Sequence, residues 1–358
     1  MRIAWIAGVL FAVIVIAGLP GLAGLAPQIE NEPWGVTTYD FAYRVDVGNF
    51  GTAPARNLTA RIALLRSFPP FQIVDSIVPA TPGFTVEVDD LGNRFAVYNL
   101  TELAAGASLM ADFTARVRVY GIDFTATDAG LTSASPGPAY TSPEPFVESA
   151  DPRIVNRSLA LRAASTGFVD YAYESYVWTT NHLTYETQPQ ERGAVWALRT
   201  GRGMCYEYSN LFTALLRAEG LAAKRVNGWG ERFQTGEVHH AEEIAHAWTL
   251  VFTADHGWIP VDPTFGDVRL YENFLKANDM HVILTEGVNR HFYRVTYTRT
   301  AGTNVQVDYV VTVLSKAEEN LSTARAVVIG AFVAVPFLLA AVITVQVVGE
   351  RRKRVYLE

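Results

Sequence analysis

Residues 201–220 read GRGMCYEYSNLFTALLRAEG, the stretch of this chain with the clearest local signal. After the first few residues, apolar side chains recur at helical spacing until Gly220 ends the pattern. The stretch therefore predicts an amphipathic helix of about 15 residues, entered through a glycine turn at Gly201 and Gly203. Cys205, the single cysteine of the chain, falls in the first turn of this helix. Free backbone amides and the positive end of the helix dipole favour a thiolate over a thiol at that position.

Two downstream motifs contain partners for a reactive thiol. His246 begins a His-Ala-Trp motif within an apolar run that predicts a strand, and Asp262 belongs to a Gly-Trp-Ile-Pro-Val-Asp-Pro-Thr motif after the next turn. A thiol nucleophile needs a base that takes its proton and a third group that orients the base. Because neighbouring antiparallel strands lie about 4.8 Å apart, His246 and Asp262 are expected side by side. Cys205, His246 and Asp262 are therefore the predicted catalytic residues.

Each of these residues alone has a plainer interpretation. A free cysteine is usually a small buried apolar residue, and a histidine on a strand is usually a hydrogen-bonded core residue. Asp262 precedes a proline and suits a turn. The occurrence of all three motifs in the order Cys, His, Asp favours the catalytic interpretation.

A metal site is the competing hypothesis. Its potential ligands are close together in the sequence: His239, His240, Glu242, Glu243 and His246. They do not form the His-Glu-x-x-His pattern of a zinc-binding helix, and residues 234–240 are predicted to form a loop between strands. A solvated loop over the cleft is therefore favoured over zinc. The other histidines show no ligand spacing and are expected to be structural or exposed: His182, His256, His281 and His291.

The motifs resemble those of the transglutaminase-like superfamily, whose members share the papain-type cysteine protease core. The resemblance covers roughly residues 140–287 and rests on GRGMCYEYSNLFTALLRAEGLAAKRVNGWG, AHAWTLVF and HGWIPVDPTFGD. Two positions depart from the family pattern: residues 221–224 replace its Ile-Pro-Ala-Arg, and Leu250 stands where a Glu is frequent. Neither departure removes one of the three predicted catalytic residues.

The resemblance implies acyl transfer through a thioester, with Cys205 as nucleophile, His246 as acid and base, and Asp262 holding the imidazole tautomer. The backbone N–H of Cys205 is expected to form part of the oxyanion hole. The sequence does not indicate which of three residues supplies the second hydrogen-bond donor of the oxyanion hole: Trp178, Gln188 or Gln190. No cofactor and no metal is expected, and no acidic calcium loop is recognisable.

Residues 27–125 are predicted to form an Ig-like β-sandwich. Apolar and polar residues alternate over 41–47, 58–64 and 113–119, which is typical of strands with one solvated face. Turn-forming residues separate these runs, and short strands at this spacing favour a sandwich. No chemistry is evident in this part, which we interpret as a spacer or adhesion module.

The predicted fold class is α+β. A papain/transglutaminase-like core, with the helix that carries Cys205 packed on an antiparallel sheet, follows the Ig-like sandwich, and transmembrane helices are expected at both ends. The Ser- and Pro-rich residues 126–152 predict a linker. The catalytic domain is expected over 153–316.

Two stretches of 24 residues, 3–26 and 326–349, contain no charge, and each is long enough for a membrane-spanning helix. Four basic residues at 351–354 predict that the tail 350–358 is cytoplasmic. The first stretch predicts either an anchor or a signal peptide cleaved after Ala26. Residues 27–325, including a short stalk at 317–325, are then expected outside the cytoplasm at the cell membrane. Four glycosylation sequons fall in this outer part: Asn57, Asn99, Asn156 and Asn320.

The composition narrows the possible functions. The chain has 358 residues, of which 49% are hydrophobic and 18% charged, which supports folded cores and excludes wholesale disorder. A net charge of −7 argues against nucleic-acid binding. The single cysteine excludes a disulfide framework and a Cys-rich metal site.

The predicted function is that of a membrane-anchored cysteine peptidase or amidase. The alternatives are a cross-linking protein-glutamine γ-glutamyltransferase and a non-catalytic binding or structural protein of the cell surface. The expected partners are a peptide or protein substrate, or an amide of the cell envelope, and the lipid bilayer through the terminal helices; no nucleic acid is expected.

Overall fold

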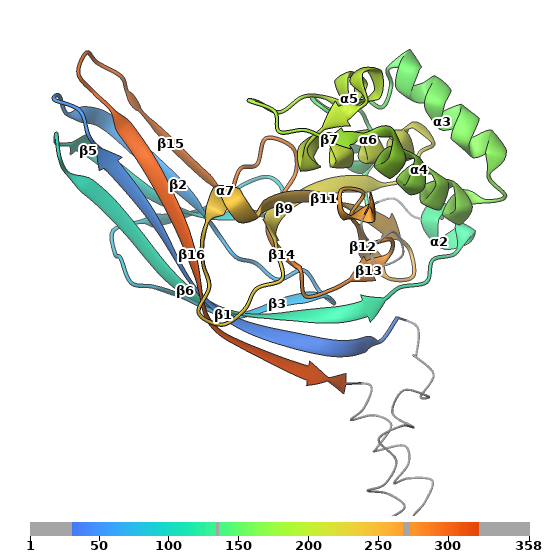
Figure 1. Ribbon diagram of the computed structural model, residues 1–358, viewed down its shortest axis with the longest axis horizontal. Coiled ribbons are helices and arrows are strands. Elements are labelled where there is room, and N and C mark those ends of the chain that lie inside the picture. Colours follow the sequence, from blue (N-terminus) through green and yellow to red (C-terminus); the bar gives the residue numbers. More distant parts are fainter. Residues whose placement is uncertain (1–30, 134–135, 268–272, 322–358) are drawn as a thin grey trace, which may run out of the picture. The chain divides into compact units, whose positions relative to one another are not determined.

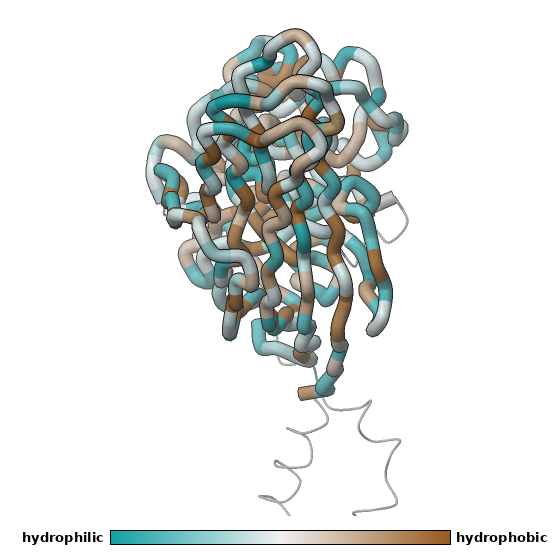
Figure 2. Tube along the Cα trace, turned by 90° about the vertical axis from the view of Figure 1, so that its left-hand side faces the viewer, coloured by the Kyte–Doolittle hydropathy of each residue, from teal (hydrophilic) through white to brown (hydrophobic). Residues whose placement is uncertain are grey.

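The alternating apolar residues near the N-terminus form long strands. The computed structural model describes residues 31–133, 136–267 and 273–321. Along β1, the side chains of Tyr39, Phe41 and Tyr43 are buried whereas their neighbours are partly exposed, as a period of two requires. Figure 2 shows this alternation of hydrophobic and hydrophilic residues along the strands. Six strands arise from this part of the chain: β1 (Pro33–Asn49), β2 (Ala55–Leu64), β3 (Gln72–Pro79), β4 (Thr85–Val88), β5 (Arg94–Leu103) and β6 (Ser108–Asp123).

These strands belong to two sheets that share one core. The first sheet has the order β10-β16-β1-β6-β13, with β3 also paired to β6, and the second has the order β15-β2-β5-β4. Phe41 and Phe113 from the first sheet join Ile62 and Phe95 from the second in a single buried cluster. We refer to these two layers as the sandwich.

Two strands from the end of the described chain complete the sandwich. β15 (Tyr293–Thr298) pairs with β2, and β16 (Val305–Asn320) lies next to β1. The sequence predicts these residues to belong to the catalytic domain at 153–316. A period of two shows that a segment is a strand, but it does not show which sheet the strand joins.

The middle of the chain forms four principal helices and a separate sheet. The sheet has the order β12-β11-β9-β14, and α6 packs against β9 and β11 (Figure 1). As predicted, α6 begins at Cys205. The main elements are α3 (Pro152–Ala164), α4 (Phe168–His182), α5 (Ala194–Thr200), α6 (Cys205–Ala218), β9 (Ala223–Gly230), β11 (Ala245–Thr253), β12 (Gly257–Val261) and β14 (His281–Glu286). Shorter elements are β7 (Thr184–Tyr185), β8 (Arg202–Gly203), β10 (Val238–His240), α7 (Ala241–Ile244), η3 (Phe265–Asp267) and β13 (Lys276–Ala277).

Both faces of this four-stranded sheet are buried. Trp248 and Ile283 pack with Phe212 of α6 in one cluster, whereas Trp229 and Val282 belong to the core of the sandwich. The sheet is therefore held between the helices and the sandwich, which fixes the strands that carry the candidate site.

The described residues of the segment 126–152, which was predicted to be a linker, contain short helices and buried side chains. The segment contains α2 (Asp128–Thr132) and η2 (Pro138–Tyr140), and the side chains of Leu131 and Val147 are buried. The Thr127 side chain caps the first turn of α2 by accepting a hydrogen bond from the N–H of Gly130. A few apolar residues thus anchor a stretch whose overall composition resembles a linker.

Both apolar stretches, 3–26 and 326–349, lie outside the described residues. Within the described ranges 31–133, 136–267 and 273–321, no helix has the length and the apolar character needed to cross a membrane.

Candidate active site

Cys205 lies at the start of α6 in a closely fitted turn. The carboxylate of Glu207 accepts hydrogen bonds from the N–H of Met204, at 2.9 Å, and from the N–H of Arg192, at 2.6 Å. A Cβ at Gly203 would collide with the Glu207 side chain, so only glycine fits the turn. Burial raises the pKa of Glu207, although these backbone hydrogen bonds oppose the shift. Glu207 thus fixes the chain just before Cys205, a residue that is 3% exposed.

His246 and Asp262, which were predicted to lie side by side, form a hydrogen bond. His246 is the second residue of β11, and Asp262 follows β12, which pairs with β11 in antiparallel fashion. His246 Nε2 lies 2.7 Å from Asp262 Oδ2. Both side chains are buried, with exposed fractions of 6% and 2%.

The surroundings of His246 favour its charged form. Burial alone lowers the pKa of His246, but the charge and hydrogen bond of Asp262, together with the nearby Cys205, raise it to about 10. Because Nε2 faces Asp262, Nδ1 is the ring nitrogen left for Cys205. Burial raises the pKa of Asp262, but His246 and His281 outweigh this effect and hold the pKa below its usual range. Asp262 is therefore ionised at neutral pH.

The second carboxylate oxygen of Asp262 is held by the backbone. Oδ1 accepts hydrogen bonds from the N–H groups of Thr264, at 2.8 Å, and of Phe265, at 3.3 Å. The Phe265 ring also stacks on His246, with centroids 4.3 Å apart and planes at 11°. The turn after β12 therefore orients both the carboxylate and the imidazole.

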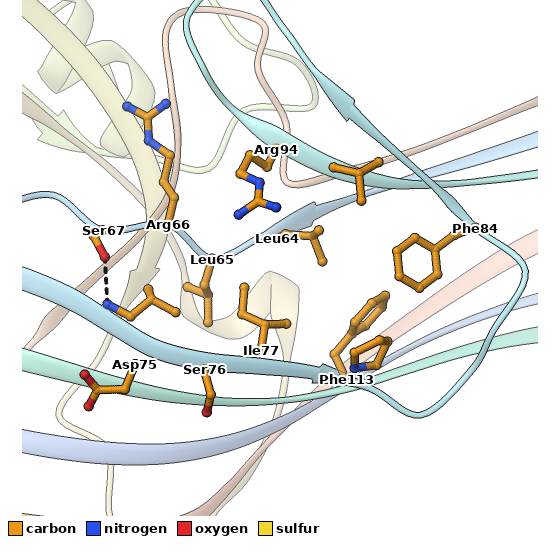
Figure 3. Close-up of a pocket in the computed structure, with 13 residues that line it drawn as sticks. Leu64, Leu65, Arg66, Ser67, Asp75, Ser76, Ile77, Phe84, Arg94 and Phe113 are labelled. Atoms are coloured by element: carbon orange, nitrogen blue, oxygen red, sulfur yellow. Dashed lines mark hydrogen bonds between the residues drawn. The ribbon is translucent and has the colours of Figure 1, made fainter.

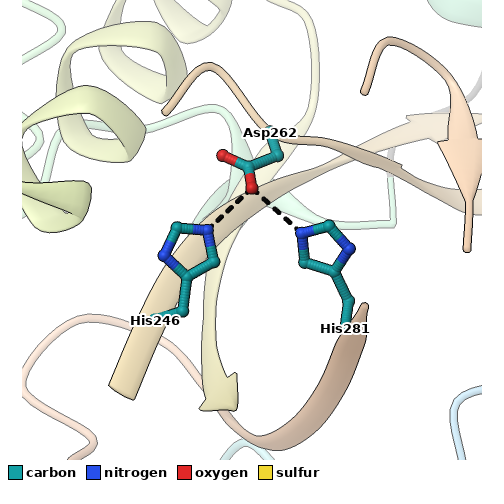
Figure 4. A group of neighbouring side chains, drawn as sticks. All are labelled: His246, Asp262 and His281. Atoms are coloured by element: carbon teal, nitrogen blue, oxygen red, sulfur yellow. Dashed lines mark hydrogen bonds and ion pairs between the residues drawn. The ribbon is translucent and has the colours of Figure 1, made fainter. Parts of the chain in front are cut away.

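A second histidine shares Asp262 (Figure 4). His281 Nε2 lies 2.9 Å from Asp262 Oδ2, the same oxygen that faces His246. On β9, between the two histidine strands, Gly228 pairs with His246 and Gly230 pairs with His281. Sequence reasoning missed His281 as a member of the site because it lies 19 residues beyond Asp262 without a recognisable motif. The only sequence feature that could have indicated His281 is its position at the start of an apolar run.

One group in the described part of the chain has spacing suited to a metal. His246, Asp262 and His281 each offer one ligand atom, and these atoms lie within 4.8 Å of one another. However, Nε2 of each histidine already hydrogen-bonds to Asp262 Oδ2, and a metal would require both nitrogens to lose their protons and these two bonds to break. We therefore assign no metal to this group.

The histidines of the alternative zinc hypothesis have other partners. His239 Nε2 lies 3.3 Å from Glu237, and His240 Nδ1 lies 2.9 Å from Asp308. Both residues are in β10, which pairs with β16 of the sandwich. Residues 234–240, expected as a loop, thus contain a short strand.

The three candidates for a second oxyanion-hole donor differ in their surroundings. The Trp178 ring stacks on His182, with centroids 4.3 Å apart. The Gln188 N–H contacts Met204 Sδ at 3.5 Å, beside Cys205, while its side-chain amide donates to Glu186. Gln190 lines a cavity of about 700 Å³. Gln188 is thus the candidate whose backbone contacts the residue before the thiol.

One cavity borders the segment that contacts the start of α6, and another lies apart from the site. The cavity of about 700 Å³ is bordered by residues 190–193 and Trp196, and Arg192 in this segment is tied to the start of α6 through Glu207. A second cavity, of about 410 Å³, lies in the sandwich between β3 and the β4–β5 pair (Figure 3). Its lining includes Leu64, Ile77 and Phe84, so it is separate from the group around Asp262.

Comparison with known proteins gives related results from sequence and from structure. Residues 156–263 match the family model described as the transglutaminase-like superfamily. A solved structure of a candidate cysteine protease from Cytophaga hutchinsonii superposes with a TM-score of 0.54 at 15% sequence identity, covering 77% of this chain and 92% of that one. At this identity the likeness is one of fold.

Two curated proteins match shorter stretches. A protein-glutamine gamma-glutamyltransferase from Pseudomonas aeruginosa is 33% identical over 98 residues, which cover 24% of this chain and 14% of that protein. Protein YebA of Bacillus subtilis, which is uncharacterized, is 25% identical over 99 residues, which cover 26% of this chain and 13% of that protein. The matched stretch thus spans only about one seventh of the length of these relatives.

Proposed function

Because residues 156–263 form a transglutaminase-like domain, we propose that the chain is a cysteine-dependent acyl-transfer enzyme whose catalytic residues are Cys205, His246 and Asp262. The observation that carries the proposal is the position of one imidazole. His246 hydrogen-bonds to Asp262 through Nε2 at 2.7 Å, and Cys205, at the start of α6, is close enough to help raise the pKa of His246. This is the arrangement that a thiol nucleophile, its base and an orienting carboxylate require.

The reaction proceeds in two halves. The Cys205 thiolate attacks the carbonyl carbon of an amide, and the oxyanion that forms is stabilised by backbone N–H groups at the helix start. When the tetrahedral intermediate collapses, His246 gives its proton to the leaving nitrogen, and the acyl group remains on Cys205 as a thioester. Neutral His246 then takes a proton from the second nucleophile, which attacks the thioester and releases the thiolate. Asp262 remains ionised throughout and stabilises the imidazolium.

The second nucleophile decides between two functions. Water gives a peptidase or amidase, which is the function that we propose. A primary amine gives a glutamine cross-linking enzyme, and the 33% identity to a protein-glutamine gamma-glutamyltransferase favours this second candidate. The residues of the triad serve both reactions equally, because the two differ only in what attacks the thioester.

One experiment separates these functions from a non-catalytic role. Full-length protein in detergent is incubated with casein and dansylcadaverine, with Cys205→Ala as the matched control. New peptide termini that depend on Cys205 support hydrolysis, whereas Cys205-dependent attachment of the dansyl group supports amine transfer. If casein is unchanged, and an iodoacetamide probe reacts with Cys205 no faster than with the urea-unfolded chain, the thiol is not catalytic and the proposal fails.

We further propose that the enzyme is anchored in the membrane and faces outward. The proposal rests on the two uncharged stretches of 24 residues and on the basic residues at 351–354. The four sequon asparagines are all exposed, which is compatible with this placement. Protease treatment of intact cells should remove residues 27–325. Protection that persists until the membrane is permeabilised would contradict the orientation.

A further inference from the structure

His281 is the residue near the proposed triad whose role remains open. It begins β14, two strands away from His246 in the sheet order β12-β11-β9-β14. Its side chain is 10% exposed, and its ring packs against Trp248, with centroids 4.7 Å apart. A polar ring that is buried this deeply needs hydrogen-bond partners.

Both nitrogens of His281 have such partners. Nε2 lies 2.9 Å from Asp262 Oδ2, and Nδ1 lies 2.8 Å from Asn278 Oδ1. Asn278 Oδ1 also accepts a hydrogen bond from the N–H of Met280 at 3.0 Å, which identifies this atom as the oxygen of the amide. Both of these oxygens are acceptors, whereas burial lowers the pKa of His281 and favours the neutral ring, which carries one N–H. We assign this N–H to Nε2, because a hydrogen bond to a carboxylate is stronger than one to an amide oxygen.

The proton in the contact with Asp262 belongs to the histidine. An ionised carboxylate only accepts hydrogen bonds, so both imidazoles that face Oδ2 present N–H groups. Asp262 thus accepts four hydrogen bonds, one from His246, one from His281 and two from the backbone of the following turn. Only the bond to His246 leads to the proposed nucleophile, and the other three hold the carboxylate in place.

We propose that His281 is a positioning residue, which donates its Nε2–H to Asp262 Oδ2 and so fixes the carboxylate that orients His246. The proposal rests on the proposed function, since it assigns a role within the same site. Without this donor, His246 is the only one of the two histidines that hydrogen-bonds to Oδ2, and the carboxylate plane rotates more freely. The imidazole then spends less time aligned with Cys205, and small misalignments of catalytic groups cost much rate.

Two substitutions separate the donor from the packing. His281→Phe keeps an aromatic ring against Trp248 but removes the donor, whereas the side-chain amide of His281→Gln can still offer an N–H near the Nε2 position. We expect His281→Phe to lower kcat by about 10-fold to 100-fold with little change in KM, as loss of a supporting partner does at other sites. His281→Gln should recover most of kcat. His256→Phe, which changes a histidine in the turn between β11 and β12, serves as the control.

A double-mutant cycle tests whether His281 acts through Asp262. If it does, His281→Phe has no further effect once Asp262→Asn has removed the carboxylate, so the double variant reacts like Asp262→Asn alone. The measured quantity is the rate of Cys205 alkylation by iodoacetamide at fixed pH in the full-length chain. Because Cys205 is the single cysteine, the rate reports on one atom and needs no known substrate. If His281→Phe lowers the alkylation rate by the same factor with and without Asp262→Asn, the proposal is overturned.

A second readout keeps this proposal separate from the proposed function. In the full-length chain labelled with ¹⁵N-histidine, His281→Phe should shift the ring signals of His246 in the same direction as Asp262→Asn, and His281→Gln should leave them near the wild-type positions. Unchanged His246 signals in His281→Phe would overturn the positioning role, whatever the reactivity of the thiol. An unreactive wild-type thiol together with shifted His246 signals would instead refute the proposed function and leave the His281–Asp262 relationship supported.

Discussion

Gly230 leaves the space that the ring of His246 occupies. A Cβ at Gly230 would lie 2.6 Å from Cβ, Cγ and Cδ2 of His246, closer than nonbonded carbon atoms approach. Gly230 ends β9, the strand that pairs with both histidine strands. The absence of a side chain at Gly230 is therefore a condition for His246 to contact Asp262.

Replacement of Gly230 by alanine should displace the His246 ring. The change adds one methyl group, so the fold is expected to persist, but kcat should fall by about 100-fold or more because the imidazole no longer aligns with Cys205. Turnover and alkylation of Cys205 would be compared with Gly35→Ala, where an added Cβ meets its nearest atom at an ordinary 3.5 Å. Wild-type kinetics in Gly230→Ala would show that the ring does not depend on this space.

The three proposed catalytic residues should act as one unit. Cys205→Ala and His246→Ala remove the nucleophile and the base, and each should abolish turnover, whereas Asp262→Asn should be severe but leave more residual activity. The double variant Cys205→Ala/His246→Ala should be no worse than Cys205→Ala. Each variant is checked by circular dichroism for retention of the fold. Full activity in Cys205→Ala would exclude the thiol mechanism.

Stability should depend on pH through His246. Its folded pKa of about 10 lies above the ordinary 6.5, so its contribution to the free energy of unfolding is complete below about pH 6.5 and is lost as the pH rises through about 10. We would measure urea unfolding at several pH values for the wild type and for His246→Asn. The difference between the two should shrink steadily between pH 6.5 and 10, because the other titrating groups are common to both proteins. A difference that stays constant over this interval would contradict the raised pKa.

Loss of the Glu207 carboxylate should loosen the turn that holds the thiol. Glu207→Gln keeps the shape of the side chain but offers a single acceptor oxygen to the N–H groups of Met204 and Arg192. One buried backbone N–H then loses its partner, and we expect a loss of about 1–3 kcal/mol in the free energy of unfolding. Glu186→Gln, which changes an exposed glutamate nearby, is the control. Equal midpoints of thermal unfolding for the two variants would show that the cap is dispensable.

Chelation separates the thiol mechanism from zinc hydrolysis. Because His239 and His240 face Glu237 and Asp308, we expect EDTA to leave activity unchanged and His239→Ala and His240→Ala to retain it. Activity would be assayed after dialysis against EDTA and again after addition of zinc. Activity that EDTA removes and zinc restores would favour the metal hypothesis.

The sequence was most informative where local pattern and motif coincide. The helix that begins at Cys205 was predictable because its glycine turn, apolar stripe and terminal Gly220 are all local signals. The contact between His246 and Asp262 was also predictable, since a short turn joins their strands and makes them neighbours. The catalytic roles of the three residues remain predictions.

Contacts between distant parts of the chain were beyond local reasoning. His281 lies on β14, which pairs with β9 and not with β11. It therefore approaches Asp262 only when the strands of the whole sheet are paired, which no local pattern predicts. The partners of β15 and β16 were missed for the same reason. The alternation that predicts a strand is identical in either sheet, and the choice depends on which apolar faces meet in the final core.

The position of β16 beside β1 has a consequence for the synthesis of the protein. During translation, β1, which ends at Asn49, emerges from the ribosome long before β16, which starts at Val305. During that interval the backbone of β1 lacks one of its neighbours, and an open strand edge is prone to pair with other chains. The helices and strands between Pro152 and Glu286 are thus translated before the sandwich on which their sheet packs is complete. A chaperone that binds the nascent chain would therefore be most useful before residues 305–320 emerge, and a chain cut short at residue 304 would be released with that edge still open.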